Sequence, residues 1–151
     1  MPLKLNDKLP DFILKNQYDK KVNSKIFFGK NLVVFFYPKD DTPGCTMEVC
    51  NFRDNYSEIK KYNSNIIGIS SDSVKSHKKF SKKFNVTYDL LSDYDNTVKK
   101  LFGVPRSLFG LLPGRVTYIF DKKGILLKII NSQININEHL LKTIKFLKKL
   151  K

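Results

Sequence analysis

Cys45 and Cys50 are the only cysteines of the chain, and their setting suggests thiol chemistry. Cys45 follows a turn formed by Thr42, Pro43 and Gly44, and an apolar pattern of helical period begins just after it. A thiol in the first turn of a helix meets backbone N–H groups without intrahelical partners and the positive end of the helix dipole. Both favour the thiolate, which is the reactive form of cysteine. The sequence therefore predicts one activated cysteine at a strand-to-helix turn.

The second cysteine lies five residues further along the same predicted helix. On a regular helix this step advances the chain by about 7.5 Å and rotates it by about 140°, which leaves the two Cα atoms roughly 8.7 Å apart. A disulfide tolerates at most about 7 Å between Cα atoms. Cys45 and Cys50 therefore cannot bond while the helix is intact, and a disulfide between them requires its first turns to unwind. The alternative is that Cys50 is only a small buried apolar residue.

The elements around the cysteines must place them at the edge of a core. Leu32–Tyr37 is an unbroken apolar run rich in β-branched and aromatic residues, which is typical of a strand buried on both faces. Pro38 ends this strand. We expect the following helix to run from about Cys45 to Tyr62, with one apolar stripe made by Val49, Phe52, Tyr56 and Ile59. Cys45 lies one turn before this stripe, so it should face the core.

The rest of the chain continues an α/β pattern. The sequence predicts an N-terminal hairpin in residues 11–22, a strand at 65–70, a helix capped by Ser73, a short helix near 96–102, a hairpin of strands 115–120 and 125–130, and a last helix capped by Asn137 with Leu140, Leu141, Ile144 and Leu147 on one side. This order favours the fold class α/β, with a mixed central sheet flanked by helices on both faces, which is the thioredoxin-like architecture. We expect residues 1–151 to form a single domain.

The composition narrows the function classes. A net charge of +14 raises the possibility of a nucleic-acid-associated protein, but 25 of the 28 basic residues are lysines spread along a chain without alanine. That is typical of a bias over the whole sequence, so we expect only loose, salt-sensitive binding to polyanions. No stretch approaches the roughly 20 apolar residues that span a bilayer. The first residues lack the apolar segment of a secretory signal.

Other polar residues are weaker candidates. Arg53 and Glu48 lie on the predicted helix, and the sequence leaves open whether they form an ion pair or support the site. His77 and His139 are far from the cysteines in sequence and are interpreted as structural or solvated residues. Two cysteines without CxxC spacing or a neighbouring histidine do not favour a zinc site or a Cys–His protease, so we expect no metal.

Longer motifs surround these residues, namely Phe35-Phe36-Tyr37-Pro38-Lys39-Asp40, Thr42-Pro43-Gly44-Cys45-Thr46, Gly68-Ile69-Ser70, Leu91-Ser92-Asp93, Leu112-Pro113-Gly114-Arg115-x-Thr117-Tyr118 and Asn131-x-Gln133. Pro38-x-x-x-Thr42-x-x-Cys45 resembles the active-site motif of the peroxiredoxins. The step to Cys50 resembles the PrxQ, or bacterioferritin comigratory protein, subgroup. The Leu-Pro-Gly-Arg form looks closest to cyanobacterial and plastid members. The resemblance covers nearly the whole chain.

This resemblance implies a role for each site residue. Cys45 would be the peroxidatic thiolate, and Cys50 would resolve its sulfenic acid as an intramolecular disulfide. Arg115 would stabilise the thiolate and donate hydrogen bonds to the bound peroxide. The Thr42 hydroxyl would accept a hydrogen bond from the peroxide while donating to the sulfur, and Pro38 would shape the loop and shield the thiolate. Without the motif, Thr42 reads equally as a helix cap and Arg115 as a surface ion-pair residue.

As a whole, the resemblance implies an atypical two-Cys peroxiredoxin that reduces hydrogen peroxide and organic hydroperoxides, with thioredoxin or a similar dithiol as its reductant. It implies no cofactor, no membrane and no specific nucleic acid. We expect a monomer in the cytoplasm, or in the plastid stroma of an alga or plant. Two rivals stay open: a peroxide sensor that relays thiol oxidation to a partner, and a basic nucleic-acid-associated protein with incidental thiols.

Overall fold

One mixed sheet organises the molecule. The computed structural model describes residues 2–105, 114–132 and 135–150. In these residues seven strands form a sheet of order β2-β1-β5-β4-β3-β6-β7. The β3–β4 and β4–β5 pairs are parallel, and the remaining pairs are antiparallel. The strands are β1 (Ile13–Lys15), β2 (Lys21–Asn23), β3 (Asn31–Phe36), β4 (Ser64–Ser70), β5 (Asp89–Ser92), β6 (Val116–Phe120) and β7 (Leu126–Asn131).

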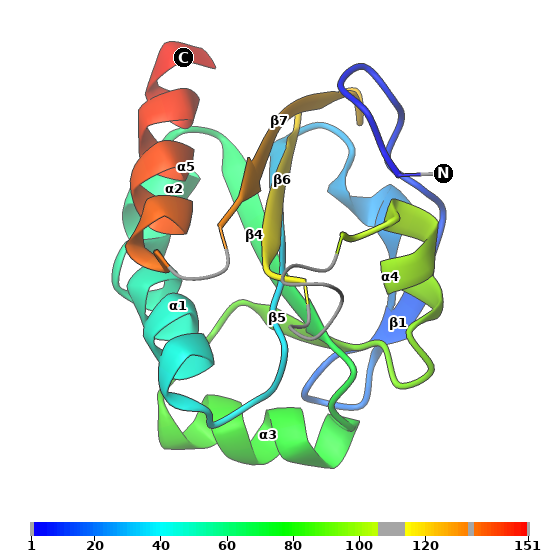
Figure 1. Cartoon of the computed structure of the whole chain (residues 1–151), viewed down its shortest axis with the longest axis vertical. Helices are drawn as coiled ribbons and strands as arrows, with labels where there is room; N and C mark the ends of the chain where they lie inside the picture. The colour runs from blue at the N-terminus through cyan, green and yellow to red at the C-terminus, as the bar shows by residue number, and fades with distance from the viewer. Residues whose placement is uncertain (1, 106–113, 133–134, 151) are drawn as a thin grey trace.

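Helices cover the two faces of this sheet. They are η1 (Ser24–Phe27), α1 (Pro43–Asp54), α2 (Tyr56–Lys61), α3 (Val74–Lys83), α4 (Thr97–Phe102) and α5 (Asn137–Leu150). Helices α1, α2 and α5 stand on one side of the sheet, and α4 stands on the other beside the N-terminal segment (Figure 1). Among the described residues, no helix combines the length and apolar character needed to cross a membrane. This arrangement confirms the predicted α/β class with helices on both faces.

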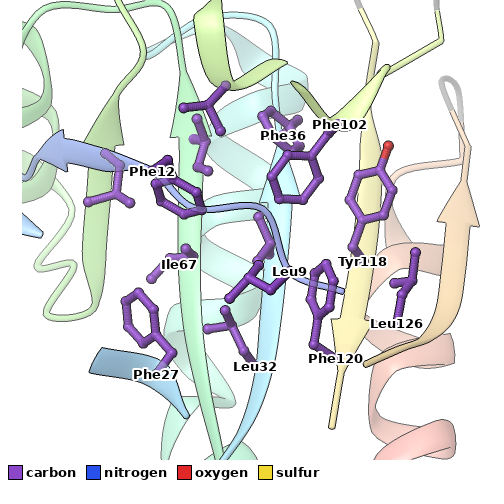
Figure 2. Packing of buried hydrophobic residues seen from close by; sticks show 14 of the residues in the cluster. Leu9, Phe12, Phe27, Leu32, Phe36, Ile67, Phe102, Tyr118, Phe120 and Leu126 are labelled. Atoms are coloured by element: carbon purple, nitrogen blue, oxygen red, sulfur yellow. The ribbon is translucent and has the colours of Figure 1, made fainter. Parts of the chain in front are cut away.

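Strand β3, which lies between β4 and β6, contributes to both cores because its side chains alternate between the two faces of the sheet. Val33 and Phe35 pack with α1 and α2 residues such as Phe52 and Ile59. Leu32, Val34 and Phe36 pack in the second cluster, which Figure 2 shows with Phe12, Phe102, Tyr118 and Phe120 around Phe36 and Leu32. Every residue of Leu32–Phe36 is at most 3% exposed. The predicted doubly buried strand is confirmed, and it forms a rigid base for the loop that follows it.

The predicted helix from about Cys45 to Tyr62 is wrong in its bounds. It begins two residues earlier, because Pro43 suits the first helical position, where no N–H is needed. It also breaks at Asn55 into α1 and α2. The Asn55 side-chain amide donates to the Asn51 carbonyl at 2.8 Å, while its backbone N–H bonds to the Phe52 carbonyl at 3.2 Å. The side chain thus competes for the acceptor that would continue the helix.

The prediction for the last helix needs two corrections. Asn137 is the first residue of α5 rather than its cap, and its side-chain oxygen accepts a hydrogen bond of 2.9 Å from Asn51 of α1. Leu141 does not face the core, since it is 66% exposed. His139 and Thr143 are fully buried on this helix instead, together with Leu147. Polar residues therefore occupy part of the inner face that the leucine pattern was expected to fill.

Candidate functional site

Cys45 lies at the point where β3 passes into α1. The backbone of Thr42 is extended, with φ −94° and ψ 152°, and Pro43 starts the helix. Cys45 is therefore in the first helical turn, as predicted, and only 1% of its surface is exposed. The free N–H groups of this turn and the helix dipole both favour a negative charge there. Both cysteines are free thiols.

Arg115 approaches the Cys45 sulfur from the neighbouring strand. The pairing of Phe36 with Val116 sets the start of β6 beside the end of β3, and Arg115 directly precedes that start. Its Nη2 donates to the Cys45 Sγ at 3.4 Å, and its Nη1 donates to Oε1 of Glu48 at 2.7 Å. The guanidinium therefore joins the thiol to a buried carboxylate one helical turn further along α1.

The charges of this group oppose one another. Burial lowers the pKa of Arg115, but the nearby Glu48 and Cys45 raise it by more, so that the pKa lies above its ordinary value. Burial raises the pKa of Glu48 to about 7, although the charge and hydrogen bond of Arg115 act to lower it. Arg115 thus stays charged, while Glu48 titrates in the neutral range. The site can stabilise an anion at the Cys45 sulfur.

Glu48 and Arg53 each form an ion pair, but with different partners. Arg53 donates to Oδ1 of Asp54 and to the Phe84 carbonyl, and it lies on the outer side of α1. Glu48 instead pairs with Arg115 inside the core.

Cys50 lies within α1 and is half-buried. Burial raises the pKa of its thiol, with Arg53 lowering and Asp54 raising it to a smaller degree. Cys50 is thus a protonated thiol at neutral pH. The sulfur of Cys45, in contrast, accepts a hydrogen bond from Arg115. The intact helix keeps the two thiols in these separate environments.

The loop before the helix carries the other two candidates. The Thr42 hydroxyl donates to the Lys39 carbonyl at 2.9 Å, and it makes no capping bond to α1. Thr42 is thus the N-cap of α1 by its backbone position, but without a side-chain capping bond. The expected donation of its hydroxyl to the Cys45 sulfur is wrong here, because the Lys39 carbonyl takes that hydrogen. Pro38 is half-buried and borders a small pocket with Asp93 and Gly114.

A buried polar cluster anchors the same loop. Asp40 accepts bonds from the Tyr37 hydroxyl at 2.6 Å and from Ser76 at 2.8 Å, and it lies 2.7 Å from His77 Nδ1. Asp72 accepts from the Asp40 N–H. Asp40, Asp72 and His77 form the one grouping of possible metal ligands among the described residues. These side chains hold one another, and their effect is to fix the loop against α3.

His139 is the site residue that sequence reasoning missed. It was interpreted as structural or solvated, yet α5 carries it to within 3.6 Å of Glu48 Oε2, measured from its Nδ1. Its Nδ1 also lies 2.7 Å from the Thr117 hydroxyl of β6. A histidine beside the apolar stripe predicted for the last helix was the only available signal. The partner lies 91 positions away, so no local pattern could have named it.

Three residues of the motifs, Leu112, Pro113 and Gln133, lie outside the described residues.

Comparison with known proteins gives one consistent answer. Residues 5–129 match the model of the AhpC/TSA family. The chain is 48% identical to "Peroxiredoxin Q, chloroplastic" of Sedum lineare over 142 residues, which is 94% of this chain and 76% of that protein. It is 50% identical to the protein of the same name from Arabidopsis thaliana, covering 92% of this chain but only 64% of the relative.

The fold agrees with this assignment. The crystal structure of peroxidoxin BcpB from Mycobacterium tuberculosis superimposes with a TM-score of 0.90 at 35% identity, covering 99% of both chains. Sequence and fold thus agree over almost the whole chain. The chain therefore belongs to the AhpC/TSA family as a peroxiredoxin of the Q group.

Proposed function

We propose that the protein reduces hydrogen peroxide and organic hydroperoxides with Cys45 as the attacking thiolate. The observation that carries this proposal is the buried hydrogen bond of 3.4 Å from Arg115 to the Cys45 sulfur. A cation that donates to the sulfur stabilises the thiolate, and its positive charge stabilises the negative charge that develops on the peroxide oxygens. The position of the sulfur in the first turn of α1 supports the same role.

The first step forms an S–O bond and breaks the O–O bond. The Cys45 thiolate attacks one peroxide oxygen, the other oxygen leaves and takes up a proton as water or an alcohol, and Cys45 becomes a sulfenic acid. Thr42 and Pro38 lie on the loop between β3 and α1, and we assign them to binding the peroxide and excluding water. The Thr42 hydroxyl now donates to the Lys39 carbonyl, so it keeps an acceptor lone pair for a peroxide hydrogen.

The second step forms the disulfide. The Cys50 thiol attacks the sulfenic sulfur, an S–S bond forms, and the sulfenic oxygen leaves as water. The raised pKa of Cys50 supports the order of events, since a protonated thiol does not compete with Cys45 for peroxide. The first turns of α1 must unwind before the two sulfurs meet.

A dithiol reductant of the thioredoxin type then completes the cycle. It attacks the disulfide, returns both cysteines to thiols and becomes a disulfide itself. We also propose that the protein acts as a monomer, because both cysteines needed for the cycle lie in one helix. The chloroplastic names of the plant relatives favour the plastid stroma if the chain comes from an alga or plant.

The test is peroxide consumption coupled to thioredoxin and thioredoxin reductase. We expect turnover by the wild-type protein and none by C45S, because a serine hydroxyl stays protonated at neutral pH. C50S should consume one peroxide per protein and then stop, with Cys45 trapped as sulfenic acid or a mixed disulfide.

Three outcomes of this test would contradict parts of the proposal. If C45S turns over peroxide with thioredoxin, Cys45 is not the nucleophile. If C50S cycles like the wild type, Cys50 is not the resolving residue. A wild-type protein that is oxidised rapidly by peroxide but is not reduced by thioredoxin would instead be a peroxide sensor.

A further inference from the structure

A second titratable pair lies behind the Arg115–Cys45 contact. One oxygen of Glu48, Oε1, accepts the bond from Arg115. The other oxygen, Oε2, faces His139 Nδ1 at 3.6 Å, and among the described residues no donor lies within hydrogen-bonding distance of it. Glu48 and His139 are each at most 1% exposed. A buried carboxylate oxygen without a donor is costly, so this geometry calls for a proton.

The contacts of His139 show where such a proton would go. The Ser132 carbonyl lies 2.7 Å from Nε2 and can only accept, so Nε2 carries a hydrogen. In the neutral ring Nδ1 is then an acceptor, and the Thr117 hydroxyl donates to it at 2.7 Å. A further proton would fit either on Glu48 Oε2, which faces Nδ1 at 3.6 Å, or on Nδ1 itself, in which case the Thr117 hydroxyl would accept from Nδ1.

We propose that Glu48 and His139 share one proton near neutral pH, and that this pair positions and tunes Arg115 for its work on Cys45. While the Glu48–His139 pair holds the proton, the positive charge of Arg115 stabilises mainly the Cys45 thiolate. When the proton leaves, a second anion shares the same guanidinium, and the thiolate is stabilised less. Loss of the proton therefore opposes attack on peroxide. Neither Glu48 nor His139 touches the sulfur, so they act through Arg115.

The other charged or titratable groups around Glu48 and His139 do not account for this titration. The charged or titratable groups that face it are Cys45 on α1, Arg115 beside β6, Tyr88 next to β5, and Glu138 and Lys142 on α5. Burial, with a smaller contribution from Glu48, raises the pKa of Tyr88 far above neutrality, so Tyr88 stays neutral. Burial lowers the pKa of His139, so that the ring can release the shared proton. Glu138 and Lys142 pair with each other at 3.2 Å and offset one another.

The experiment measures the rate constant of Cys45 oxidation by hydrogen peroxide in the C50S background, by competition with a haem peroxidase from about pH 5.5 to 8.5. The proposal rests on the proposed function, and this design separates the two. If Cys45 is not oxidised, the proposed function fails. If it is oxidised, we expect the rate constant to fall roughly fivefold in the neutral range, as the pair loses its proton.

Two variants identify the pair. Glu48→Gln should remove the falling limb, because an amide does not titrate. His139→Gln should move the limb to lower pH by about one unit, because the amide cannot carry the shared proton. The matched control is His77→Gln, which changes the other fully buried histidine of the described chain and should leave the limb in place. A limb that persists in Glu48→Gln, or that does not move in His139→Gln, would overturn the proposal.

A measurement on the unaltered histidine covers the case of a variant that does not fold. Imidazole ¹⁵N chemical shifts of the reduced protein should show His139 holding its Nε2 hydrogen throughout and changing at Nδ1 in the neutral range. In Glu48→Gln this change should move or vanish. A His139 titration that is the same in both proteins would show that the two side chains are uncoupled, and the proposal would fail.

Discussion

At the residue scale, Arg115 connects the two acidic groups of the proposed site. Separate nitrogens of its guanidinium donate to the sulfur of Cys45 and to the carboxylate of Glu48. The planar, permanently charged group allows both bonds at once, which the point charge of a lysine does not. The two contacts explain why the side chain is buried although it is charged.

Arg115→Met should slow oxidation of Cys45 by peroxide on the order of 100-fold, because it removes both the cation and the donors to the peroxide. The thiolate fraction at neutral pH should fall with the rate, and thiolate absorbance would show this. Arg53→Met is a suitable control, since Arg53 bonds to Asp54 and the Phe84 carbonyl rather than to Cys45. An unchanged rate in Arg115→Met would make Arg115 a structural ion-pair residue only.

Glu48 also makes the stability of the fold depend on pH. Its pKa is raised from 4.5 to about 7 in the folded protein, so between these values the folded state holds a proton that the unfolded state has released. The contribution of Glu48 to stability is therefore complete below about pH 4.5 and is lost as the pH rises towards 7. In Glu48→Gln this loss, at most about 3 kcal/mol, should disappear from urea unfolding curves recorded across that range. Parallel pH profiles for both proteins would contradict the assignment.

At the element scale, the N-terminal turn of α5 contacts α1 and stabilises its helical conformation. Asn137 accepts from Asn51, and His139 faces Glu48. Gly44 leaves room for this approach, since a Cβ there would lie 2.8 Å from Cδ1 of Ile136. In the proposed cycle α1 must unwind before the disulfide forms, so these contacts would set how readily Cys50 reaches the sulfenic acid before a second peroxide does.

Asn137→Ala should therefore speed opening of α1. Loss of one exposed hydrogen bond of about 1 kcal/mol corresponds to roughly a fivefold faster amide exchange in residues 43–51 of the reduced protein. Oxidation should remove protection from the same amides, while those of β3 keep theirs. Asn51→Ala is the matched variant, and the double variant should open no faster than either single one. Equal protection of α1 in reduced and oxidised protein would point to an intermolecular disulfide.

At the scale of the whole molecule, the lysines are spread along the sequence rather than gathered near the two cysteines. The net charge of +14 is large for 151 residues, and such a charge attracts polyanions without a specific site. The buried site instead depends on charges inside the fold. Charge and catalysis are therefore expected to be independent properties of this protein.

Binding to duplex DNA should accordingly be weak and should weaken steeply as salt is raised. Fluorescence anisotropy of a labelled duplex, titrated with wild-type protein and with C45S, should give the same curves at each salt concentration. Tight binding that persists at high salt, or binding that depends on the redox state of Cys45, would support a nucleic-acid-associated role.

Local patterns in the sequence were enough to predict several features. The run Leu32–Tyr37, the turn before Cys45, the cap at Ser73 and the hairpin of β6 and β7 depend on side-chain period and turn chemistry, which neighbouring residues carry. Cys45 in the first turn of a helix follows from the same patterns. The break at Asn55 was missed because an asparagine is compatible with a helix until its side chain takes the backbone acceptor.

Only the tertiary structure decided what surrounds the sulfur. The family motif was enough to select Arg115 from the sequence. That Arg115 bonds to Glu48, however, depends on the register of β6 against β3. The approach of His139 depends on how α5 packs across α1, over a separation of 91 positions. Contacts of this kind arise from strand pairing and helix packing, so the physical information that specifies them is spread over the whole core rather than written near the residues themselves.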